Sequence, residues 1–266
     1  MRRYWNLLPI LGLMLLSGAA EAQLRQVAVL DIPGRPGFES IAWAKGYLVM
    51  AHDASNTLDV FDPAKRRVVA QVKGMNDPRG IGVDEQAGLV YVANAGDQSI
   101  AVVATSNWMV QERIQLKASP DSLLFVPETH TLYIGNWRTQ SVSILKSGQH
   151  EPAATVEVGG RPERMIFDVA TRQVYASLED SSEVVALDES GKVGHRWKLN
   201  ASLPTGLALD PQSRRLFVAV RYAVVILNAD SGTEIGRVAS PAGTDALWFD
   251  DGTRTLYAGA TGGSVS

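Results

Sequence analysis

The chain has 266 residues, of which 45% are apolar and 20% are charged, as in a folded globular protein rather than a disordered one. Its formal net charge of −3 gives no general attraction to nucleic acid or to anionic membranes. Because the chain has no cysteine, disulfides, cysteine-ligated zinc, iron–sulfur clusters and covalent haem attachment are excluded.

The first 22 residues predict a cleavable export signal. Two arginines near the N-terminus precede an apolar run over residues 7–16, and Ala20-Glu21-Ala22 fits the small-x-small cleavage pattern. A membrane anchor is the alternative, but the apolar run is shorter than the roughly 20 residues that span a bilayer. We therefore expect a periplasmic protein that begins at Gln23, with residues 23–266 forming one domain.

The rest of the chain repeats with a period of about 42 residues. Proline recurs at a constant spacing and begins four similar units, at Pro78, Pro120, Pro162 and Pro204. Two looser copies begin near residues 38 and 244. Self-similarity at this period is typical of proteins built from stacked structural repeats.

Each unit predicts four short strands bounded by Gly, Pro, Asn and Asp. The first strand of a unit is almost entirely apolar, whereas the fourth alternates and carries charge. The second strands are expected at 48–51, 89–94, 131–136, 173–177, 215–220 and 255–260. The third strands are expected at 58–62, 99–104, 141–146, 183–188 and 223–228, and the fourth at 67–73, 111–117, 153–159, 194–200 and 234–240. No stretch shows sustained helical periodicity.

These units predict an all-β fold, a β-propeller of four-stranded antiparallel blades. A single unit cannot bury both of its faces, and radial stacking of the units buries them. A two-sheet sandwich is the alternative, but a sandwich does not require a fixed 42-residue period.

The second strands resemble a known family. Tyr91-Val92-Ala93-Asn94 and Tyr133-Ile134-Gly135-Asn136 lie at matching places and are similar to the YVTN repeat of bacterial exported β-propellers, which include the YncE-like periplasmic proteins. The resemblance covers residues 38–266 and weakens in the later units, where the asparagine is lost. It implies a periplasmic binding scaffold, and some members of the family bind nucleic acid.

The sequence allows two ways of closing the ring of blades. Residues 24–32 have the pattern of an outer fourth strand, and the sixth unit stops inside its third strand. The family commonly has seven blades, so we expect six visible blades, an incomplete last blade and a seventh blade in an intact chain. The alternative is a six-bladed ring with a short last blade.

Turns at one end of the propeller are the expected binding site, because loops that converge from a repeat ring form ligand sites. The turns that open the units and the turns that follow the second strands share this end. The predicted ligand-binding residues are Glu39, His52, Arg79, Asn94, Asp121, Asn136, Trp137, Arg138, Glu163, Arg164, Arg221, Tyr222 and Asp245.

Several of these residues have a structural interpretation as well. The two asparagines are expected to cap their own turns, and His52 is either a general base, a metal ligand or an ordinary surface histidine. Glu39, Asp121 and Asp245, together with the asparagines, are weak candidates for Ca²⁺ or Mg²⁺ ligands. No catalytic residue is assigned.

The sequence is compatible with three functions. A non-catalytic scaffold that binds a small molecule or an envelope protein is favoured, because no catalytic motif is present. A divalent-metal-dependent lactonase or esterase is the first alternative. A nucleic-acid-binding propeller is the second, with arginines and aromatic side chains in the turns, although the interleaved carboxylates oppose it.

Overall fold

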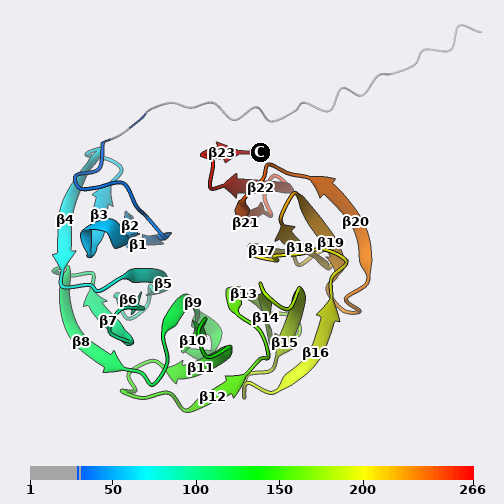
Figure 1. Ribbon diagram of the computed structural model, residues 1–266. Helices are drawn as coiled ribbons and strands as arrows, with labels where there is room; N and C mark the ends of the chain where they lie inside the picture. The colour runs from blue at the N-terminus through cyan, green and yellow to red at the C-terminus, as the bar shows by residue number, and fades with distance from the viewer. Residues whose placement is uncertain (1–28, 30) are drawn as a thin grey trace, which may run out of the picture.

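The computed structural model describes residue 29 and residues 31–266. The predicted export signal over residues 1–22 therefore lies outside the described residues, as does most of the strand predicted over 24–32. The described part is all-β and forms six antiparallel sheets arranged around a common axis, with the first strand of each sheet nearest the centre (Figure 1).

The first three blades each contain four strands in simple up-and-down order. The first blade consists of β1 (Ser40–Ala44), β2 (Tyr47–His52), β3 (Thr57–Asp62) and β4 (Arg67–Lys73). The second consists of β5 (Pro78–Asp84), β6 (Leu89–Asn94), β7 (Ser99–Ala104) and β8 (Met109–Gln115). The third consists of β9 (Pro120–Val126), β10 (Thr131–Asn136), β11 (Ser141–Lys146) and β12 (Ala154–Glu157).

The last three blades continue the pattern, and the sixth has three strands within the described residues. The fourth blade consists of β13 (Pro162–Asp168), β14 (Gln173–Leu178), β15 (Glu183–Leu187) and β16 (Val193–Lys198). The fifth consists of β17 (Leu207–Asp210), β18 (Arg215–Val220), β19 (Ala223–Asn228) and β20 (Glu234–Ala239). The sixth consists of β21 (Thr244–Asp250), β22 (Thr255–Ala260) and β23 (Ser264–Val265).

Helix is almost absent from the described residues, as the sequence predicted. It is limited to two single turns of 3₁₀-helix, η1 (Asp53–Ser55) and η2 (Pro127–Thr129). Both lie in turns between strands. The propeller fold expected from the 42-residue period is thus confirmed.

The core lies between neighbouring blades. Alternate residues of each inner strand face opposite neighbours, so that Ile81 and Val83 of β5 pack on the first blade. In the same way Leu123 and Phe125 of β9 pack on the second blade. Every blade except the first and last is therefore buried on both faces, which explains why the inner strands are nearly all apolar.

Within the part of the chain that the structure describes, the first and sixth blades each have one uncovered face. Among the described residues the inner strands of successive blades contact one another, whereas β1 and β21 make no comparable contact (Figure 1). Ile41 and Trp43 of β1 are 64% and 55% exposed, and Trp248 of β21 is 61% exposed. A cleft of about 740 Å³ lies between these two blades and extends along the inner strands of the fourth and fifth.

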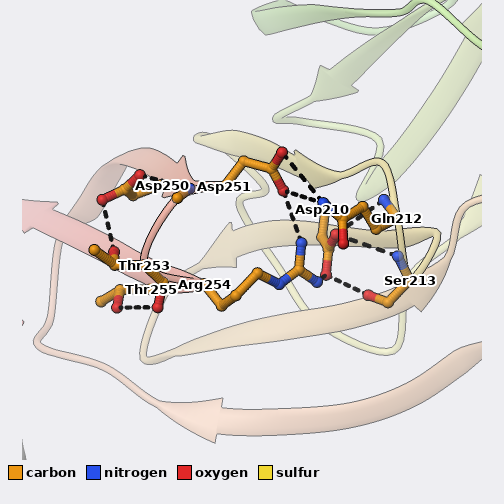
Figure 2. A network of polar contacts seen from close by, with 9 residues as sticks. Asp210, Gln212, Ser213, Asp250, Asp251, Thr253, Arg254 and Thr255 are labelled. Atoms are coloured by element: carbon orange, nitrogen blue, oxygen red, sulfur yellow. Dashed lines mark hydrogen bonds and ion pairs between the residues drawn. The ribbon is translucent and has the colours of Figure 1, made fainter.

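Arginine–aspartate pairs join the later blades on the side opposite the opening turns. The inner strand of the fifth blade ends in Asp210, whose carboxylate accepts hydrogen bonds from Ser213 and from Arg254 of the sixth blade (Figure 2). Arg254 also donates to Asp251 at 2.8 Å. One blade earlier, Arg214 reaches back to the buried Asp168 at 2.7 Å.

Candidate ligand-binding site at the propeller axis

The opening turns converge on the axis. One residue from each of the six blades lines a cavity of about 110 Å³, which we call the axial cavity. These residues are Glu39, Arg79, Asp121, Glu163, Thr205 and Asp245. The structure therefore brings together the six opening-turn residues that the sequence proposed as ligands, since Arg164 also lines the cavity, with the equivalent Thr205 of the fifth blade.

A local irregularity of the inner strands places these side chains. The strand register shifts between Pro78 and Ile81, and again between Pro162 and Met165. Similar shifts occur at the starts of β9 and β21. A β-bulge re-aims the side chain that it contains, and here the bulged segments carry four of the cavity residues, Arg79, Asp121, Glu163 and Asp245.

Glycine allows the inner strands of neighbouring blades to approach one another at two positions near the axis. A Cβ atom at Gly80 would lie 2.6 Å from the carbonyl oxygen of Asp121, and one at Gly206 would lie 2.7 Å from that of Asp245. Because both contacts are with backbone atoms, a side chain at either position would push neighbouring blades apart.

Arg79 is held between two carboxylates. Its guanidinium nitrogens lie 2.9 Å from Glu39 and 2.9 Å from Asp77, which precedes the same strand. The side chain of Arg79 is 32% exposed, so the ion pairs are partly shielded from water. Besides Asp245, the other acidic groups that line the cavity are those of Asp121 and Glu163.

These two carboxyl groups are unusually easy to protonate. Burial raises the pKa of Asp121, and the charge of Glu39 adds to this effect against the opposing influence of Arg79. Burial, followed by repulsion from Asp121 and Glu179, raises the pKa of Glu163 to about 7. Glu163 therefore changes its charge near neutral pH, as groups at functional sites often do.

A wider mouth lies above the axial cavity and shares four of its residues. This mouth pocket has a volume of about 370 Å³ and is also lined by Asp77, Trp137, Arg138 and Glu179. Trp137 donates a hydrogen bond from Nε1 to Glu163 at 3.0 Å, and the guanidinium of Arg161 lies 4.0 Å from the centre of its ring. The tryptophan thus joins the third blade to the fourth at the rim of the site.

His52 does not line either cavity, although the sequence proposed it as a ligand. Its ring is fully buried, with Nδ1 2.8 Å from Asp59 and Nε2 2.6 Å from the carbonyl oxygen of Arg35. Burial alone would lower the pKa of His52, but these hydrogen bonds outweigh it and raise the pKa above its ordinary value. The ring fastens the segment before β1 to the first blade.

Asn94 and Asn136 are also fully buried. Asn94 accepts a hydrogen bond from the backbone of Asn76, and Asn136 donates to Ser141 and Ser143 across its own turn. The side chains support the turns that carry the mouth residues, in keeping with the predicted capping role, and neither lines the axial cavity or the mouth pocket.

The remaining predicted residues divide between the site and the surface. Arg138 lines the mouth pocket and Arg164 lines the axial cavity. Arg221 and Tyr222 line neither; both are exposed, and the guanidinium lies 5.6 Å from the centre of the Tyr222 ring. Over the part of the chain that the structure describes, no three His, Asp or Glu side chains are grouped as a metal site would require.

Sequence reasoning missed Asp77 of the mouth pocket and Arg161, whose guanidinium lies over Trp137 at the rim. Both lie just before an inner strand, next to a proline that was recognised. Glu179, which follows β14 directly, was recognised as a turn residue at this end of the propeller but was not proposed as a ligand. The contact of Arg161 with Trp137 depends on the neighbouring blade and has no local signal.

Comparison with known proteins supports the β-propeller fold but identifies neither a family nor a function. No protein-family model matches the chain, and no curated protein matches it in sequence. Among solved structures, a chain of Kuenenia stuttgartiensis hydrazine synthase is similar, with a TM-score of 0.62 and 16% identity over 92% of this chain and 98% of that chain. At this identity the likeness shows a shared β-propeller fold.

Proposed function

We propose that this protein is an exported, non-catalytic β-propeller of the YVTN type that binds a small cationic ligand at its mouth. The observation that carries the proposal is the convergence of one side chain from each of the six blades on the axial cavity. The Tyr-x-x-Asn segments of the second and third blades support the YVTN assignment. No helix among residues 31–266 is long and apolar enough to cross a membrane.

The charge of the mouth favours a cation. Five carboxylic residues and two arginines line the mouth pocket, and one of the arginines, Arg79, is already paired with Glu39 and Asp77. An ammonium group placed near Asp121 and Glu163 would favour their ionised forms and relieve their mutual repulsion. The same carboxylates disfavour a nucleic-acid phosphate, so the binding function is proposed ahead of that alternative.

Isothermal titration with 1,4-diaminobutane tests the ligand class. We expect binding that is stronger at pH 8 than at pH 6, because Glu163 must lose its proton to bind the cation. Glu163→Gln should weaken binding at pH 8 about tenfold, which corresponds to about 1.4 kcal/mol. The matched control Glu85→Gln removes an exposed carboxylate that follows the other end of β5 and lines neither cavity, so it should leave affinity unchanged. Preference for succinate over the diamine, or equal affinity of Glu163→Gln, would contradict the proposal.

Export is tested by expressing the full chain in a Gram-negative host. We expect the protein in the periplasmic fraction, with an intact mass that places the first residue at Gln23. Replacement of Ala20 and Ala22 by leucine should block cleavage, because the signal peptidase needs small residues at these positions. Recovery of uncleaved wild-type chain in the cytoplasm would argue against the export assignment while leaving the ligand proposal intact.

A further inference from the structure

Four outer strands carry a long polar side chain that fastens the blade to the segment entering it. The donors are Gln71, Arg113, Arg196 and Arg237, and the acceptors are the carbonyl oxygens of Pro33, Gly74, Val158 and Asn200, respectively. The distances from Arg196 and Arg237 are 2.7 and 3.1 Å. Because donors and acceptors recur at the repeat period, this contact is a property of the blade.

The third blade lacks this contact. At the equivalent position of β12 stands Thr155, and the equivalent acceptor is the carbonyl of Leu116 in the segment that enters the blade. A threonine side chain is too short to reach this carbonyl oxygen, and Oγ1 of Thr155 lies 2.9 Å from Ser143 Oγ instead. Ser141 likewise replaces the glutamate of the fourth blade, Glu183, which accepts a hydrogen bond from Arg196.

A cavity of about 450 Å³ occupies the space that the missing side chain would fill. Its hydroxyl and carboxylate acceptors all come from the third blade, on β11, β12 and the segments beside them, whereas the second blade contributes the end of β8 and the chain that follows it. The lining includes Leu116, Lys117, Thr139, Ser141, Ser143, Glu151, Pro152, Thr155 and Glu157. Two carboxylates face one lysine, so the charge of the walls favours a cation, and Leu116 and Pro152 offer an apolar surface for an alkyl stem.

We propose that this cavity, which we call the arginine slot, binds a guanidinium group supplied by a ligand. In the second, fourth and fifth blades the fold itself places a guanidinium at the corresponding position. The planar guanidinium carries five N–H donors, and the slot presents carboxylate and hydroxyl acceptors at its walls. A compact ammonium ion fits such a set less well. The proposal does not depend on the ligand of the axial cavity.

Binding of ethylguanidinium and ethylammonium, followed by ligand-observed NMR at constant ionic strength, tests the proposal. We expect ethylguanidinium to bind at least tenfold more tightly. Thr155→Arg should reduce its affinity at least tenfold and raise the melting temperature, because the new arginine fills the slot from within. Thr155→Val keeps the space open and should bind within threefold of wild type. Glu157→Gln, which removes one wall charge, should weaken binding severalfold.

Acetyl-arginine amide distinguishes the two sources of the guanidinium. If acetyl-arginine amide binds at least as tightly as ethylguanidinium, the ligand is an arginine side chain of a protein partner. If only ethylguanidinium binds, the ligand is a small molecule. Either result supports the arginine slot. Unchanged affinity in a folded Thr155→Arg variant, or equal affinity for the two simple cations, would overturn it.

Discussion

Replacing Arg214 by alanine is expected to lower the free energy of unfolding by about 3 to 5 kcal/mol at pH 7. Arg214 links two blades, because its guanidinium lies 2.7 Å from Asp168 of the fourth blade and 2.6 Å from Asp230 of the fifth. Asp168 is fully buried, so that removal of the arginine leaves a buried carboxylate without its cationic partner. Urea denaturation monitored by tryptophan fluorescence measures the loss.

Arg172 provides a matched control for this variant. It occupies the same turn position one blade earlier and has nearly the same backbone conformation, with φ of 54° against 53° for Arg214. Its partner is Glu189, and its own side chain is 57% exposed, because the third blade ends its inner strand in Val126 rather than in an aspartate. Arg172→Ala should therefore destabilise the protein much less than Arg214→Ala. Equal losses in the two variants would show that the buried pair is not the cause.

The loss in Arg214→Ala is expected to depend on pH. Burial alone would raise the pKa of Asp168, but hydrogen bonds from Arg214 and Thr171 outweigh it and hold the pKa below its ordinary value. A lowered pKa contributes stability above the pKa of the unfolded chain, and this contribution disappears as the pH falls through the folded value. The difference between wild type and variant should therefore shrink in acid.

Glu163→Gln is expected to act in the opposite direction and to stabilise the protein in alkali. The pKa of Glu163 is raised from 4.5 to about 7 in the folded state. Ionisation of Glu163 is therefore less favourable in the folded protein than in the unfolded chain, which destabilises the fold. The cost is absent below pH 4.5, grows as the pH rises and is complete above pH 7. After an allowance for solvent screening, we expect a gain of about 1 to 3 kcal/mol at pH 8 that declines towards zero near pH 4.5.

Glutamine isolates the charge in this experiment, because its carbonyl oxygen still accepts the hydrogen bond from Trp137. Thermal unfolding of wild type, Glu163→Gln and the surface variant Glu85→Gln across pH 4.5 to 8.5 provides the measurement. The control should stay within about 0.5 kcal/mol of wild type throughout. A gain of the same size at every pH would trace the effect to packing rather than to ionisation.

Much of the fold could be predicted because each blade repeats the same local pattern. The proline spacing located the inner strands, and it correctly placed Arg79, Asp121 and Glu163 at equivalent positions of three blades. Apolar inner strands and alternating outer strands follow from burial, which local sequence records directly. The propeller and its axial cavity were therefore accessible without coordinates.

The direction in which individual side chains point was harder to predict from the sequence. His52 is the last residue of β2, and its ring is buried against Asp59 and Arg35. Trp137 instead follows β10, and its side chain reaches Glu163 of the next blade. The partners Arg35 and Glu163 belong to other segments of the chain, so the sequence around each residue does not identify them. The arginine slot was also not predicted. Thr155 stands out only when the structure shows that it occupies the position of Arg113 and Arg196 in the neighbouring blades.

The uncovered faces of the first and sixth blades have a consequence for the order in which the molecule comes apart. A blade stacked between two others loses two interfaces when it opens, whereas a blade with bare Ile41 and Trp43 or bare Trp248 loses one. In such a nearly one-dimensional array, fraying starts at the outer members and moves inward. The central blades, which hold Trp137, Glu163 and the arginine slot, thus belong to the most persistent part of the structure.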